Sequence, residues 1–220
     1  MVRKFALALS GLSLVIAAPA AALTPLDLLI QAAFQTTDKQ AAIAKVNQVM
    51  AATASATDAP GQLQHATAIG YHAKLTRSPS EAKRSRALFE QLVAANPRDA
   101  EAQLMLGGWH LDAIAEGFLT ASFLNAKKAL GLAGVDRAVA LGGDRAFFRG
   151  MAAMMRIRLD PDDIGAALTL ASAAAAAPAP TDLDRIAKRD AQAMLIPLKA
   201  GDGRAAAALA RKLLPFGRVQ

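Results

Sequence analysis

The fold of this chain is decided by the stretch LFEQLVAANPRDAEAQLMLGGWHLDAIAE, which runs from Leu88 to Glu116. Its first part has the apolar periodicity of an amphipathic helix, Asn96-Pro97-Arg98 interrupts that helix, and a second, almost wholly apolar helix follows. Stacked helix-hairpin repeats pass from one unit to the next through a join of this kind. The stretch therefore indicates a helical-repeat architecture, and it says little about chemistry.

Composition extends the helical prediction to the whole chain. Hydrophobic residues make up 54% of the sequence, aromatic residues only 5%, and there is no cysteine. Alanine and leucine dominate the apolar residues, which favours helix and lets helices approach closely. Because disulfides and thiolate metal sites are excluded, helix packing has to stabilise the fold. We expect an all-α protein.

The first 22 residues have the features of a secretory signal peptide. Arg3 and Lys4 form a positive region, an apolar run extends from Phe5 to Ala18, and Ala20-Ala21-Ala22 supplies the small residues that a signal peptidase accepts. We therefore expect a signal peptide over 1–22 and a single periplasmic domain over 23–220, with an uncleaved anchor as the alternative. The apolar run is shorter than the roughly 20 residues of a membrane span, so no membrane insertion is expected after cleavage.

The charge pattern bears on possible partners. The whole chain has a net charge of +7, and without residues 1–22 it has 23 basic and 18 acidic residues, a net charge of +5. The basic residues are dispersed among acids, as in Glu81-Ala82-Lys83-Arg84. A nucleic-acid interface needs basic residues clustered on one face. No nucleic-acid partner is expected.

Capping and breaking residues predict most helix boundaries. Ser78 or Ser80 is expected to cap a helix, and Asp160 is expected to cap another with Pro161 in its first turn. The other predicted elements are helices over 25–34 and 38–53, a break at 57–61 with a helix to about 75, a helix start at 181–184, and a turn at 201–203.

An internal repeat appears when the second helices of successive pairs are aligned on their terminal proline or glycine. The pattern is a small residue, a large residue four positions later and a small or apolar residue three positions after that. The copies are Ala42-Val46-Val49, Ser85-Phe89-Leu92, Gly131-Val135-Ala138, Ala166-Leu170-Ala173 and the degenerate Ala205-Leu209-Lys212.

Two motifs are similar to those of the tetratricopeptide-repeat family. Ser85, Phe89 and Pro97 match the spacing A-x3-F-x6/7-P, and Leu106-Gly107-x2-His110 matches L-G-x2-Y, with Ile69-Gly70-x2-Ala73 as a weaker copy. The chain resembles a divergent, exported tetratricopeptide-repeat protein over roughly 38–217. The resemblance implies about five antiparallel helix hairpins stacked as a right-handed α-solenoid. A non-repetitive alanine-rich helical bundle is the alternative.

The candidate binding residues are Tyr71, His72, Trp109, His110 and Asp112. Trp109 is the only tryptophan, and it either stacks on a ligand or fills the core, while His110 takes the tyrosine position of the repeat. Asp112 shares a helix face with Glu116, but two carboxylates without a third ligand make no metal site. No catalytic residue, metal or cofactor is expected.

These observations favour a periplasmic binding or scaffold protein that holds a protein or peptide on a concave helical surface. The alternative is an accessory component of a TRAP-type solute-uptake system, since some such components are also exported tetratricopeptide-like proteins. An enclosed apolar cavity would favour that alternative, whereas an open groove would favour a scaffold. A remote alternative is an exported hydrolase built on His110, Asp112 and Glu116.

Two further segments carry predictions. Residues 117–128 form an insertion relative to the usual repeat, and its Phe118 and Phe123 are expected to pack into the structure rather than to cover a groove. The apolar end Leu213-Leu214-Pro215-Phe216 has no polar terminal cap, which hints at an exposed apolar surface and a possible homodimer.

Overall fold

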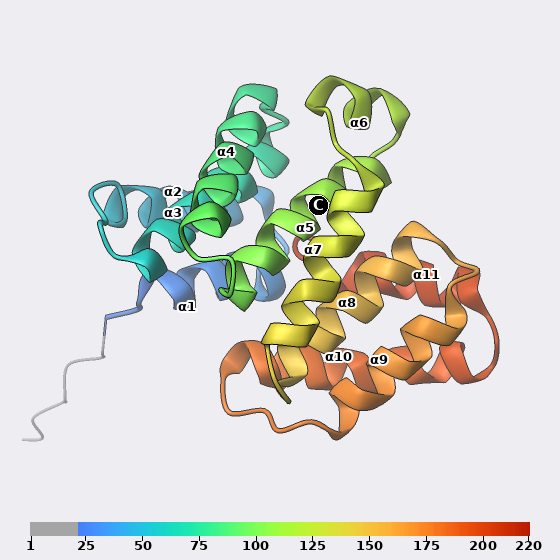
Figure 1. The fold of residues 1–220 in the computed structure, drawn as a ribbon. Coiled ribbons are helices and arrows are strands. Elements are labelled where there is room, and N and C mark those ends of the chain that lie inside the picture. The colour runs from blue at the N-terminus through green and yellow to red at the C-terminus, as the bar shows by residue number, and fades with distance from the viewer. Residues whose placement is uncertain (1–21) are drawn as a thin grey trace, which may run out of the picture.

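The computed structural model describes residues 22–220, so the predicted signal peptide, apart from its last residue, lies outside the described residues. Over that range the chain forms eleven α-helices and one π-helical segment, and it contains no β-strand (Figure 1). The prediction of an all-α protein is confirmed for this part of the chain.

The first half of the chain contains α1 (Pro25–Ile30), η1 (Gln31–Gln35), α2 (Lys39–Ala52), α3 (Ala59–Thr76), α4 (Pro79–Ala95) and α5 (Ala100–Ala115). The second half contains α6 (Phe118–Leu124), α7 (Lys128–Leu141), α8 (Ala146–Leu159), α9 (Ile164–Ala176), α10 (Asp182–Lys199) and α11 (Gly203–Leu213).

Side-chain caps begin several of these helices where the sequence predicted them. Asp38 and Asp58 accept hydrogen bonds from the third backbone N–H of α2 and α3, and Ser78, rather than Ser80, caps α4. Asp99 accepts two backbone N–H groups at the start of α5. The helix start predicted at 181–184 is confirmed, and Thr181 forms a capping box with the third residue of α10.

The predicted helix start at Asp160 is wrong. Asp160 ends α8, because its backbone N–H donates to the carbonyl of Arg156, and α9 begins only at Ile164. The Asp160 side chain accepts the backbone N–H of Asp162 at 3.1 Å, which makes a local turn in place of a helical cap. Residues 160–163 therefore form the connection between α8 and α9.

The helices pack in consecutive pairs. Within the pairs α1 contacts α2, α3 contacts α4, α5 contacts α7, α8 contacts α9 and α10 contacts α11. The first helices of neighbouring pairs also contact one another, since α1 meets α3, α3 meets α5, α5 meets α8 and α8 meets α10. In Figure 1, α5 accordingly lies between the helices of the N-terminal half and those of the C-terminal half.

The second helices of four pairs bury residues at the same spacing, whereas α4 buries Ser85 and Phe89 but leaves the third position, Leu92, only partly buried. Ala42, Val46 and Val49 of α2 are fully buried, and so are Gly131, Val135 and Ala138 of α7. For α9 and α11 the predicted alignment is one residue too early. The buried residues there are Ala167, Ala171 and Ala174 on α9, and Ala206, Ala210 and Leu213 on α11. The spacing of four and then three residues is kept after this correction.

Glycine allows the closest helix contacts inside two pairs. A Cβ atom added to Gly107 on α5 would lie 2.7 Å from the backbone nitrogen of Val135 on α7. In the preceding pair, a Cβ atom on Gly70 would lie 2.6 Å from the Oγ of Ser85. The L-G element of the first helix thus packs against the small residue of the second helix in both pairs.

The expectation of an exposed apolar C-terminal end is wrong. Leu213, Leu214 and Phe216 are each less than 9% exposed. Leu213 and Leu214 belong to the core of the C-terminal half, and Phe216 packs against the N-terminal helices. The backbone N–H of Phe216 donates to the carbonyl of Ala33 at 2.8 Å, and the Phe216 ring meets the Tyr71 ring edge-on at 4.8 Å. The feature that suggested a homodimer is therefore satisfied within the chain.

The predicted packing of the insertion is also wrong. Residues 117–128 form the short helix α6, in which Phe118 is 83% exposed, Leu119 82% and Phe123 62%. Only Leu124 is buried. Because α6 projects from the rest of the protein, as Figure 1 shows at the top of the view, Phe118, Leu119 and Phe123 remain exposed.

Candidate functional site

A large groove lies between the N-terminal and C-terminal halves of the molecule. Its volume is about 900 Å³, and it is partly open to solvent. The first helices of the pairs supply most of its lining, chiefly α3 and α5 with smaller parts from α1 and α8, and the second helix α4 and the short helix α6 also contribute. The volume lies at the upper end of the range for ligand pockets.

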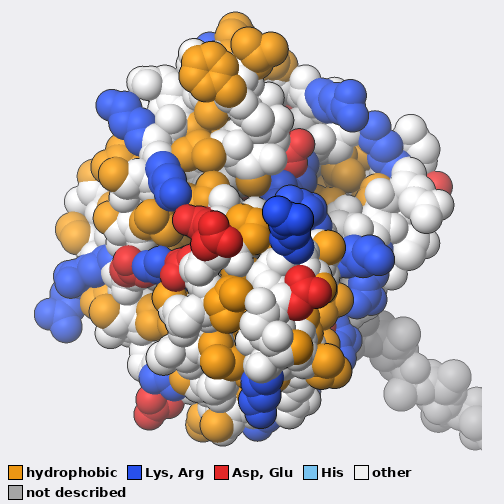
Figure 2. Space-filling view, turned by 90° about the vertical axis from the view of Figure 1, so that its right-hand side faces the viewer, with side chains coloured by type: hydrophobic (Ala, Val, Ile, Leu, Met, Phe, Trp, Pro, Cys, Tyr) orange, Lys and Arg blue, Asp and Glu red, His pale blue; other side chains and the backbone are white. Residues whose placement is uncertain are grey.

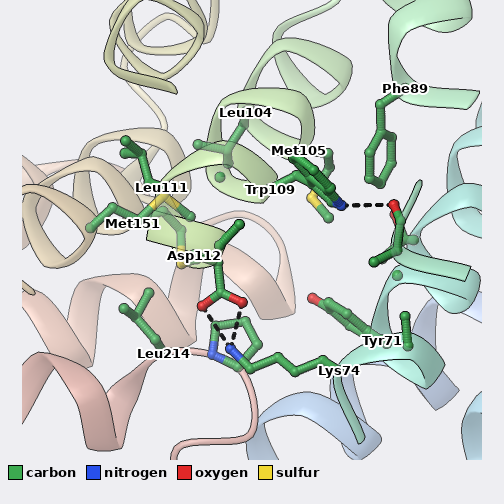
Figure 3. Close-up of a pocket in the computed structure, with 18 of the residues that line it drawn as sticks. Tyr71, Lys74, Phe89, Leu104, Met105, Trp109, Leu111, Asp112, Met151 and Leu214 are labelled. Carbon is green, nitrogen blue, oxygen red and sulfur yellow. Dashed lines mark hydrogen bonds and ion pairs between the residues drawn. The ribbon is translucent and has the colours of Figure 1, made fainter. Parts of the chain in front are cut away.

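The walls of the groove are mainly apolar. Leu104, Met105 and Leu111 line it from α5, Met151 from α8, and Leu214 from the C-terminal tail (Figure 3). Methionine side chains adapt their shape to different apolar partners, so a wall that contains them suits a ligand without a rigid outline.

Trp109 lines the groove in a fixed orientation. Its Nε1 donates to the carbonyl of Ala82 on α4 at 3.0 Å, and the Arg86 guanidinium lies 5.3 Å from the centre of its ring system. The side chain is partly buried, with its ring against the groove. The prediction that Trp109 packs and the prediction that it meets a ligand are therefore compatible.

A cluster of charged side chains crosses the groove from three successive first helices. Lys74 on α3 places Nζ 2.7 Å from Oδ1 of Asp112 on α5, and Arg158 on α8 pairs with the same carboxylate. Arg158 also donates to Glu116 at 3.0 Å. Two cations thus balance two carboxylates, and the cluster is neutral as a whole.

The surroundings change the acidities of two groove residues. Burial alone would raise the pKa of Asp112, but the charges of Lys74 and Arg158 and their hydrogen bonds outweigh it and lower that pKa below its usual value. Burial raises the pKa of Tyr71, and the nearby Asp112 charge raises it further. Asp112 is therefore ionised and Tyr71 neutral at neutral pH, and the Tyr71 hydroxyl points into the groove (Figure 3).

The structure brings three of the five predicted binding residues to the groove: Tyr71, Trp109 and Asp112. The other two lie outside its lining. His72 pairs with Glu81 on α4, with Nδ1 2.7 Å from Oε2. His110 is 3% exposed, and its Nδ1 accepts the backbone N–H of Lys127 at 3.4 Å. Both histidines thus hold neighbouring segments in place.

The carboxylates offer no acid–base pair. Asp112 and Glu116 share a helix face as predicted, but Arg158 binds both of them. Within residues 22–220, no group of three or more histidine, aspartate and glutamate side chains could hold a metal ion. In the same range, no helix is both long enough and apolar enough to cross a membrane.

The sequence analysis missed Lys74 and Arg158, which complete the charged cluster. Lys74 follows Tyr71 by three residues, and Arg158 follows Met155 by three, so each shares a helix face with a groove residue. This shared helix face is the sequence feature from which Lys74 and Arg158 could have been predicted as groove residues. Their meeting at Asp112 depends on the packing of three helix pairs, which periodicity alone does not give.

Comparison with protein-family models, with curated proteins and with solved structures gives no match. A function for this chain is therefore inferred from its fold and its groove.

Proposed function

We propose that this protein is a non-catalytic binding or scaffold protein, in which a short right-handed solenoid of tetratricopeptide-like hairpins holds a peptide or a segment of a partner protein. The observation that carries the proposal is the apolar groove of about 900 Å³ lined by the first helices of successive pairs. Solenoids of helix pairs use their concave surface in this way.

Three features support the repeat assignment. Each helix pair contacts its sequence neighbours through first helices. The second helices of four pairs bury residues at one recurring spacing, and Gly70 and Gly107 each lie close to the second helix of their own pair. One exception is that α11 also contacts α8, which is not its pair partner. A bundle without repeats has no reason to reproduce the same spacing in successive hairpins.

The groove chemistry favours an apolar peptide segment over a small charged substrate. The charged cluster of Lys74, Asp112, Arg158 and Glu116 is internally neutralised, so this cluster presents no net charge to a ligand. Polar groups of Tyr71, Lys74 and Arg158 remain beside apolar walls, which suits a peptide that has both backbone polarity and apolar side chains. The groove is partly open to solvent, whereas an enclosed cavity was expected for the uptake accessory.

Binding can be followed through the only tryptophan, because Trp109 lines the groove. The experiment captures partners from a periplasmic extract and then titrates peptides of the captured protein while Trp109 emission is recorded. A Met105→Lys variant places a charge in the apolar wall and is expected to lower capture at least tenfold. The matched control is Ile196→Lys, since Ile196 is 77% exposed on α10 and does not line the groove.

The proposal predicts that the control variant captures as the unaltered protein does and that the peptide shifts Trp109 emission. Equal capture by the Met105→Lys variant, with its helix content unchanged, would show that the groove is not the binding surface.

A further inference from the structure

The projecting helix α6 exposes an apolar tip. Phe118 and Leu119 are more than 80% exposed and Phe123 is 62% exposed, although large apolar side chains are normally withdrawn from water. Figure 2 shows hydrophobic side chains gathered at the top of the molecule, where α6 lies in Figure 1. Such a cluster on a projecting element marks an interaction surface.

The base of α6 is firmly attached, so the tip is held in a defined position. Arg86 on α4 donates to the carbonyl of Leu124 at 2.8 Å, and the Leu124 side chain is buried. The backbone N–H of Lys127 donates to Nδ1 of the buried His110. Gly117 and Asn125 have positive φ angles of 112° and 54° at the two ends of the helix, which lets the chain turn sharply there.

The charges beside the tip are mainly positive, and the adjacent Glu116 is paired with Arg158. The segment from Gly117 to Lys128 contains two lysines and no acidic residue. Lys127 and Lys128 are exposed, and Nζ of the exposed Lys83 lies 4.1 Å from the centre of the Phe123 ring. Figure 2 shows Lys and Arg side chains on both sides below the apolar tip. Apolar and aromatic residues ringed by lysines match the interface of an anionic lipid bilayer.

We propose that α6 docks this protein on the surface of an anionic phospholipid membrane. Phe118, Leu119 and Phe123 enter the boundary between headgroups and acyl chains, and the surrounding lysines bind the lipid phosphates. This is peripheral attachment and differs from a membrane span. Because Leu119 and Phe123 also line the groove, docking places the mouth of the groove at the membrane surface.

The test uses the chain from residue 23, which contains every described helix and lacks the apolar run of the predicted signal peptide. Co-sedimentation is measured with vesicles of phosphatidylcholine alone and with vesicles that contain phosphatidylglycerol. Binding is expected only to the anionic vesicles, and it should weaken as salt is added. The Phe118→Ser/Leu119→Ser double variant is expected to lower the partition coefficient at least tenfold.

Two controls test whether vesicle binding depends on α6 itself or on any exposed apolar or positively charged side chain. Ile196→Ser removes an equally exposed apolar side chain from α10 and should leave binding unchanged. Lys127→Gln/Lys128→Gln should lower binding about tenfold. The matched Lys199→Gln/Lys212→Gln variant removes the same charge from exposed positions outside α6 and should have a much smaller effect.

Failure of the unaltered chain to bind anionic vesicles would overturn the proposal, as would full binding by the Phe118→Ser/Leu119→Ser variant. If that variant instead loses a protein partner while neither form binds vesicles, α6 is a protein-docking element and the membrane assignment is wrong. The vesicle measurements contain no groove ligand, so their outcomes do not depend on what occupies the groove.

Discussion

Lys74 and Asp112 form an ion pair across the groove, with the Lys74 Nζ 2.7 Å from Oδ1 and 2.9 Å from Oδ2. The two residues lie on the first helices of adjacent pairs, and Arg158 extends the pairing to the next pair. The cluster therefore connects three helix pairs at the surface that is proposed to bind a ligand. The same cluster both stabilises the packing of the three helix pairs and shapes the groove.

Asp112→Asn is expected to lower the free energy of unfolding by about 1–2 kcal/mol at pH 7, because two partly buried cations lose their common partner. The lowered pKa of Asp112 means that its contribution is present above the unfolded-state value of 3.8 and is lost as the pH falls below it. Urea unfolding at pH 7 and at pH 3 measures this difference. Asp144→Asn is the control, since Asp144 is 85% exposed and should matter little.

Asp184→Asn is expected to cost about 3 kcal/mol of unfolding free energy. The Asp184 side chain is fully buried and accepts hydrogen bonds from the Phe147 backbone at 3.0 Å, from Arg145 and from Thr181. It thereby joins the start of α8 to the start of α10. The exposed Asp182→Asn on the same helix is the control. Similar urea midpoints for the two variants would contradict this role.

Gly107→Ala is expected to destabilise the protein by about 1–3 kcal/mol, because the new Cβ atom would lie 2.7 Å from the backbone of α7 and no flexible side chain can move aside. The control is Gly165→Ala on α9, where a Cβ atom meets nothing within 4 Å. That substitution should stabilise the helix by about 0.5–1 kcal/mol. Thermal unfolding of both variants should give shifts of opposite sign.

His110 is expected to make stability depend on pH below 6.5. Burial lowers its pKa from 6.5, and Arg86 and Lys127 lower it further against the opposing charge of Glu90. The unfolded chain therefore takes up a proton first as the pH falls below 6.5, and the free energy of unfolding decreases. The pKa of His65 is lowered in the same direction. A His110→Asn variant should show a smaller drop between pH 7.5 and 5 in urea unfolding, and an unchanged drop would assign the effect elsewhere.

Local signals in the sequence predicted the helices well. Asp38, Ser78 and Thr181 cap helices where a polar residue precedes an apolar periodic segment, because capping depends on a few neighbouring atoms. The Asp160 segment misled the prediction, since the same residue types that cap a helix also make turns. The one-residue error on α9 arose because its run of alanines offers several equivalent periodic positions.

Contacts between residues that are far apart in the sequence were harder to predict. Tyr71, Trp109 and Asp112 were predicted from residue type and do line one groove, but the cations that meet Asp112 come from other helix pairs. The exposure of Phe118 runs against the general behaviour of apolar residues, so composition pointed to packing. The return of the C-terminal tail has no local signal, because a buried Phe216 and an exposed one leave the same pattern in the sequence.

That returning tail changes how the chain should unfold. A linear array of helix pairs frays from its two ends, since each terminal unit has a neighbour on one side only. Here the Phe216 backbone bonds to Ala33, and the backbone N–H of Gln220 bonds to the carbonyl of Thr37 at 3.0 Å. Neither end can open without breaking contacts with the other. The terminal helices therefore belong to the same cooperative unit, and their amide protons should exchange with solvent as slowly as those of the middle of the chain.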